Sequence, residues 1–91
     1  MIQRTVLIEN ELGLHARAAA KFVKLAARFE SDVKLCRLGN DESIDGKSIL
    51  GILLMAAAKG TRFQITFDGR DEEMAATEIV RLIEDKFGEE Q

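Results

Sequence analysis

In the stretch TRFQITFD, residues 61–68, polar and apolar residues alternate from Arg62 to Asp68. Successive side chains of a β-strand point to opposite faces of a sheet, so Phe63, Ile65 and Phe67 share one face and the polar residues share the other. A period of two is typical of a strand that is buried on one side only. We therefore predict a strand here, with its aromatic face packed on the core.

Strand and helix patterns alternate on both sides of this stretch. β-forming residues predict strands at 2–8 and 32–38, with a short third strand at 42–45. Helix-forming or amphipathic residues predict helices at 16–29, within 47–60 and at 72–87. Asp71 is the expected N-cap of the last helix, and Gly88 its expected C-terminal stop. The order β-α-β-β-α-β-α predicts an α+β fold of two layers, with helices on one face of a mostly antiparallel sheet.

Length and composition restrict the class of protein. A chain of 91 residues corresponds to one domain, which we expect to span 1–91. The net charge of −3 argues against a nucleic-acid partner. The longest apolar run, 49–58, is too short to cross a bilayer, so we expect no membrane insertion. A single cysteine and the lack of a signal-peptide pattern indicate the cytoplasm.

The sequence predicts neither a metal site nor a cofactor. It contains one histidine and one cysteine, too few for the usual zinc ligand sets. No glycine-rich nucleotide loop is present, and nothing resembles a hydrolytic triad.

The single histidine, His15, directly precedes the predicted helix over 16–29. A helix N-terminus has unpaired backbone N–H groups and a partial positive charge, which disfavour a charged imidazolium and attract anions. If His15 accepted a phosphoryl group, the backbone N–H groups of Ala16, Arg17 and Ala18 could hold its oxygens. The Arg17 side chain could add charge-assisted hydrogen bonds. The residues alone leave two interpretations open, a phosphoryl-accepting imidazole and an ordinary surface histidine.

A basic stripe follows the histidine. Its members are spaced four, three and four residues apart, which places them on one helix face: Arg17, Lys21, Lys24 and Arg28. Both a solvated face and a docking strip for an acidic partner fit this pattern.

Two motifs resemble the histidine-containing phosphocarrier (HPr) family of the bacterial phosphotransferase system: GLHARAAA at 13–20 and DGKSILGILLMAAAKGT at 45–61. The resemblance runs along nearly the whole chain. It implies an open-faced β-sandwich, a four-stranded antiparallel sheet covered on one face by three helices. It also implies that Nδ1 of His15 accepts a phosphoryl group, with Arg17 assisting. The donor would be the first enzyme of the system, which draws the group from phosphoenolpyruvate, and the receiver a histidine on a downstream acceptor protein.

The resemblance implies further sites. Ser48 matches a regulatory serine that a dedicated kinase phosphorylates in some bacteria, although a helix-capping role explains it equally well. The residues that we expect to dock partner proteins are Lys21, Phe22, Lys24, Arg28, Ile49, Leu50 and Leu53. The last three also fit an ordinary core, and we expect at least one of them to be buried there.

One position departs from the family pattern, because Ala18 stands where members usually have proline. Proline is tolerated in a first helical turn, so this difference leaves the phosphate geometry and the transfer rate open. We expect a monomer, since a relay must free one face for successive partners. Those partners would belong to a sugar-transport branch or to a regulatory, nitrogen-type branch. The alternatives are a non-catalytic binding module of the same fold and a small nucleic-acid binder.

Overall fold

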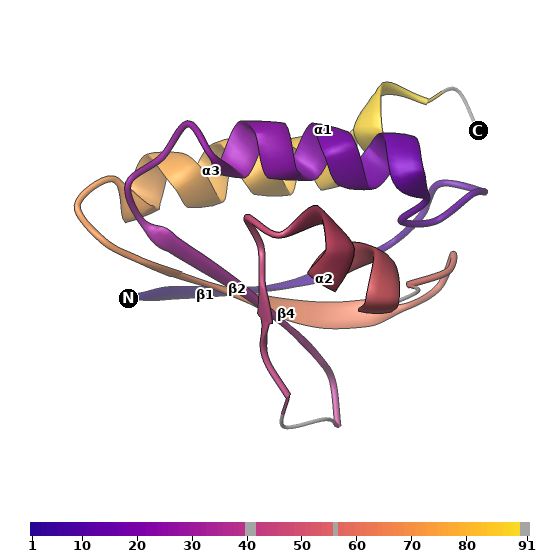
Figure 1. Ribbon diagram of the computed structural model, residues 1–91, viewed down its shortest axis with the longest axis horizontal. Helices are drawn as coiled ribbons and strands as arrows, with labels where there is room; N and C mark the ends of the chain where they lie inside the picture. The colour runs from indigo at the N-terminus through magenta and orange to yellow at the C-terminus, as the bar shows by residue number, and fades with distance from the viewer. Residues whose placement is uncertain (40–41, 56, 90–91) are drawn as a thin grey trace.

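The computed structural model describes residues 1–39, 42–55 and 57–89. Along these residues strands and helices follow each other in the predicted order (Figure 1). The elements are β1 (Ile2–Leu7), α1 (Ala16–Ala26), β2 (Asp32–Arg37), β3 (Ile44–Asp45), α2 (Ile49–Met55), β4 (Arg62–Asp68), α3 (Glu72–Glu84) and the short 3₁₀ turn η1 (Lys86–Gly88).

The strands form one antiparallel sheet in the order β1-β4-β2-β3. The alternating stretch that predicted β4 lies in the interior of this sheet, paired with β1 on one side and with β2 on the other. Ile65 faces Arg4 of β1 and Leu35 of β2 in the register. The α+β prediction and the antiparallel sheet are therefore confirmed.

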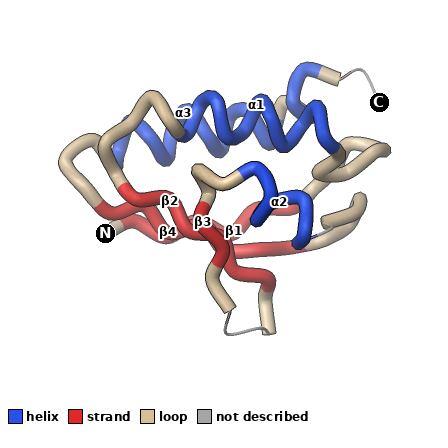
Figure 2. Tube along the Cα trace, viewed as in Figure 1, coloured by secondary structure: helices blue, strands red, loops and turns tan. Residues whose placement is uncertain are grey.

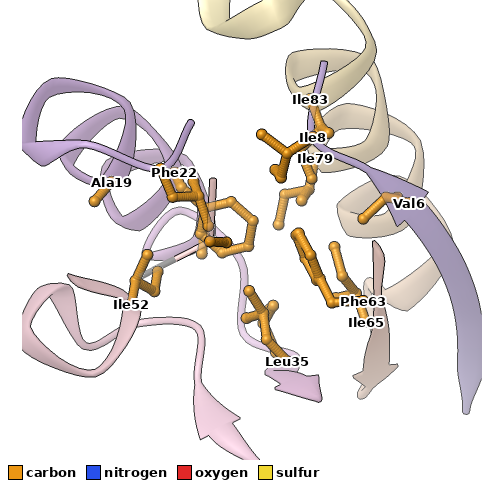
Figure 3. Packing of buried hydrophobic residues seen from close by; sticks show 14 of the residues in the cluster. Val6, Ile8, Ala19, Phe22, Leu35, Ile52, Phe63, Ile65, Ile79 and Ile83 are labelled. Atoms are coloured by element: carbon orange, nitrogen blue, oxygen red, sulfur yellow. The ribbon is translucent and has the colours of Figure 1, made fainter. Parts of the chain in front are cut away.

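The helices cover one face of this sheet (Figure 2). Phe63, Ile65 and Phe67 of β4 are fully buried beneath them, as the alternation predicts. Phe22 of α1 and Ile79 of α3 meet this face from above, as Figure 3 shows. The core thus lies between the sheet and the helices, which leaves the helix ends and the outer helix faces available for function.

Two helices end earlier than predicted. The helix expected over 16–29 ends at Ala26, because the backbone N–H groups of Glu30 and Ser31 turn toward the Asp71 carboxylate, which accepts from them at 2.9 and 3.0 Å. Asp71 stands at the N-cap position of α3, but its side chain makes these bonds and does not cap the helix. The helix expected over 72–87 ends at Glu84.

No helix within the described ranges is long and apolar enough to cross a membrane.

Candidate functional site

His15 is the N-cap residue of α1, with an extended backbone (φ −76°, ψ 179°). Its Nδ1 accepts a hydrogen bond from the backbone N–H of Arg17 at 3.3 Å. The imidazole therefore lies at the helix end whose first-turn amides have no partner within the helix. Its side chain is 24% exposed, so the ring is partly covered but open to another protein.

The loop before His15 is held against the segment that follows α2. The backbone N–H of Leu14 donates to the Ala57 carbonyl at 2.8 Å. Gly13 has a left-handed backbone (φ +66°), and a Cβ built there would lie 2.5 Å from the same carbonyl oxygen. Only glycine fits this approach. The contact joins the two motifs that lie far apart in the sequence.

A carboxylate from the far end of the chain reaches the ring. Oε2 of Glu89 lies 2.5 Å from Nε2 of His15. Nδ2 of Asn10 donates to Oε1 of Glu89 at 3.0 Å and to the Gly13 carbonyl at 2.8 Å. The hydrogen bond with His15 is the main cause that lowers the pKa of Glu89 below its ordinary value.

Sequence reasoning missed Asn10 and Glu89. Asn10 is fully buried, and a polar residue buried beside a turn is visible only once the fold is known. Glu89 lies 74 positions from His15, so no local spacing relates the two.

The basic stripe is divided between two places. Arg17, Lys21 and Lys24 are exposed on α1 and line one surface hollow together with Ile49 of α2. Arg28 lies beyond the end of α1 and lines a different hollow, so it does not belong to the first surface. Nζ of Lys21 donates to the Phe87 carbonyl at 2.6 Å, so this lysine also binds the C-terminal segment.

Two predictions about the apolar docking residues are wrong. Phe22 is 0% exposed, because it points from α1 into the core and not toward a partner. In contrast, Ile49, Leu50 and Leu53 are all exposed, at 43, 64 and 37%, so none of them is buried in the core as expected. α2 buries Ile52 and Met55 and leaves the neighbouring Leu54 75% exposed, although no pattern in the sequence indicates a surface role for Leu54.

Ser48 directly precedes α2, and its Oγ accepts a hydrogen bond from the Gly51 N–H at 3.1 Å. This contact is that of an N-terminal cap, as one of the two interpretations predicts. Phosphorylation of Ser48 stays a prediction.

Within residues 1–39, 42–55 and 57–89, no group of three or more histidine, cysteine, aspartate or glutamate side chains is placed to hold a metal ion.

The chain is similar to known proteins along nearly its whole length. A family model described as "PTS HPr component phosphorylation site" matches residues 2–85. The phosphocarrier protein HPr of Cupriavidus necator is 45% identical over 89 residues, covering 98% of each chain. The HPr of Pseudomonas aeruginosa is 46% identical over 85 residues, covering 92% of each chain. The crystal structure of HPr-C-His from Thermoanaerobacter tengcongensis matches at a TM-score of 0.93 with 40% identity, covering 100% of both chains.

Proposed function

Since the chain belongs to the HPr family of phosphocarrier proteins of the phosphotransferase system, we propose that His15 is the residue that carries its phosphoryl group. The observation that carries the proposal is the position of Nδ1 of His15 over the first turn of α1. Among the described residues, His15 supplies the imidazole that this chemistry needs, since the sequence has no other histidine.

The transfer is a displacement at phosphorus. The lone pair of Nδ1 of His15 forms a new bond to the phosphorus atom of the phosphorylated first enzyme. The bond between phosphorus and its donor atom breaks, and its electron pair stays with the donor atom. Transfer to the downstream acceptor repeats the step in the other direction, with Nδ1 as the leaving atom. The chain is thus a relay with a transient phosphohistidine and has no small-molecule substrate of its own.

The backbone N–H groups in the first turn of α1 can donate to the phosphoryl oxygens. The N–H of Arg17 donates to Nδ1 in the unmodified chain, and a phosphoryl group on Nδ1 would take that lone pair and release this N–H to a phosphoryl oxygen. The N–H groups of Ala16 and Ala18 lie in the same turn. The exposed Arg17 guanidinium adds a positive charge beside them.

Partner proteins of the phosphotransferase system must approach His15 from its exposed side. We assign this docking to the hollow lined by Arg17, Lys21, Lys24 and Ile49, together with Leu50, Leu53 and Leu54 on α2. A positive rim beside an apolar surface fits an acidic partner with an apolar centre.

Because Lys24 and Arg28 of the basic stripe line different hollows, substituting each of them gives a matched test of the docking surface. Lys24→Glu reverses a charge inside the hollow, and Arg28→Glu makes the same change of net charge outside it. We expect Lys24→Glu to slow association with the first enzyme and to reduce its salt dependence, and Arg28→Glu to have a smaller effect. Equal effects of the two variants would contradict the assignment.

Regulation at Ser48 is part of the same proposal. A phosphate on Ser48 would add negative charge next to Ile49, which borders the docking hollow, and so repel an acidic partner. A serine kinase and phosphorylase would be the partners that set this state. We also propose that the chain works as a single domain and a monomer in the cytoplasm, because its carrier face must be free to exchange partners.

The purified chain mixed with the first enzyme and phosphoenolpyruvate tests the central proposal. Intact mass should show one added phosphoryl group that is labile to acid and absent from His15→Ala. The same addition on His15→Ala would assign the group to another residue. No addition to the unmodified chain would overturn the proposed role.

A further inference from the structure

The C-terminal segment 86–89 folds back beside the N-terminal end of α1 (Figure 1). Lys86 and Phe87 both have left-handed backbones, with φ of 55° and 57°. This conformation is unfavourable for residues that carry a Cβ atom, and it persists only where the surroundings fix it. Here the buried Phe87 ring anchors the segment, and Lys21 Nζ binds the Phe87 carbonyl.

The segment ends by placing one carboxylate against His15. Oε2 of Glu89 contacts Nε2 of His15, and Oε1 accepts from Asn10. Asn10 is itself fixed, because it is fully buried and also bound to the Gly13 carbonyl. The carboxylate is 16% exposed, so both of its oxygens are oriented by protein groups in a site that excludes most water.

Both contacts of the imidazole place its single ring proton on Nε2. An ionised carboxylate can only accept a hydrogen bond, so Nε2 must carry the ring proton. The Arg17 N–H donates to Nδ1, so Nδ1 must be unprotonated. In a neutral histidine the partner of one nitrogen fixes the state of the other.

We propose that Glu89 is a positioning residue that holds His15 in the Nε2–H tautomer and so keeps Nδ1 unprotonated, with a lone pair that can accept the phosphoryl group. When the Nδ1–P bond forms, the proton stays on Nε2 and the ring gains a positive charge, which the Glu89 carboxylate faces. The inference rests on the proposed function of His15.

The chain offers a matched set of variants. Glu89→Gln removes the charge and keeps the shape, and Glu89→Ala removes the contact. Glu84→Gln makes the same change of charge at an exposed carboxylate that ends α3 and serves as the control. Thermal unfolding of all variants shows whether the fold is intact.

The ¹⁵N chemical shifts of the His15 ring nitrogens, measured where the ring is neutral, report the tautomer directly. We expect the proton on Nε2 in the unmodified chain and in Glu84→Gln. In Glu89→Ala the ratio of Nδ1–H to Nε2–H should rise about tenfold, which corresponds to about 1.4 kcal/mol, with a smaller rise in Glu89→Gln. The rate of phosphoryl uptake from the phosphorylated first enzyme should fall about tenfold in Glu89→Ala, because the positive charge that develops on the ring as the Nδ1–P bond forms no longer faces a carboxylate. The shift of some rings to the Nδ1–H tautomer, which has no lone pair at the accepting atom, adds to this loss.

The tautomer ratio and the uptake rate test the role of Glu89 separately from the carrier function of His15, on which it rests. Uptake by the unmodified chain, combined with an unchanged tautomer ratio or an unchanged uptake rate in Glu89→Ala, would overturn the role of Glu89 and leave His15 as the carrier. No uptake by the unmodified chain would overturn the carrier function itself, although the ring shifts would still report the Glu89 contact.

Discussion

Substituting Gly13 should destabilise the loop that presents His15. An alanine there keeps a left-handed backbone, which costs roughly 1–2 kcal/mol. Its Cβ would lie 2.5 Å from the Ala57 carbonyl oxygen, so that carbonyl must move and its hydrogen bond with the Leu14 N–H weakens, a further loss of about 1 kcal/mol. The lower entropy of the unfolded alanine chain offsets about 0.5 kcal/mol. We expect Gly13→Ala to lower the free energy of unfolding by about 2 kcal/mol and the Tm by about 8–16 °C.

Gly60→Ala is the control that separates the backbone conformation from the clash. Gly60 also has a left-handed backbone (φ +91°), but a Cβ there would meet nothing within 4 Å. Urea unfolding should therefore show a loss of only about 1 kcal/mol for this variant. Equal losses for the two variants would refute the steric argument. Uptake of phosphoryl groups should slow only in Gly13→Ala, because the clash with the Ala57 carbonyl displaces Leu14, which directly precedes His15.

Three further predictions concern the core, acid stability and the first turn of α1. Phe22→Ala should lower the free energy of unfolding by about 3–5 kcal/mol in urea, because the ring is fully buried; a loss below about 1 kcal/mol would contradict its core position. Hydrogen bonds from Ser31 and from the backbone N–H of Glu30 lower the pKa of Asp71 below its ordinary value of 3.8. The stability that this carboxylate contributes is present above pH 3.8 and is lost as the pH falls through its lowered pKa. The difference in free energy of unfolding between the unmodified chain and Asp71→Asn should therefore become smaller at acid pH. A difference in free energy of unfolding that does not change with pH would contradict this role of the ionised Asp71 carboxylate. Ala18→Pro should change the free energy of unfolding by no more than about 1 kcal/mol, because the first turn tolerates proline. It should keep phosphoryl uptake, because the N–H groups of Ala16 and Arg17 remain to hold the phosphoryl oxygens; loss of uptake would show that the Ala18 N–H is required.

The sequence predicted the features that depend on neighbouring residues. The alternation over 61–68 identified β4 and its buried face, because a strand with one face in the core imposes a period of two. The start of α1 after His15 followed from the helix-forming run and the preceding turn. The fold class followed from the order of such local elements.

The features that depend on distant contacts could not be predicted in the same way. α1 ends at Ala26 because the following turn binds Asp71, more than forty positions away, and helix propensity alone carries no sign of that contact. Ile49 and Leu50 are as apolar as core residues, and only the orientation of α2 shows that they face outward. The Glu89 carboxylate reaches His15 through a left-handed turn at Lys86 and Phe87, a conformation that these residue types do not favour.

The proposed carrier role of His15 is tested most directly by identifying the atom that carries the phosphoryl group. We would phosphorylate the ¹⁵N-labelled chain with the first enzyme and phosphoenolpyruvate and record the ¹⁵N spectrum of the His15 ring with and without ³¹P decoupling. We expect coupling of ³¹P to Nδ1, with the ring proton on Nε2. Coupling to Nε2, or an unchanged His15 ring in a chain whose mass shows the added group, would contradict it.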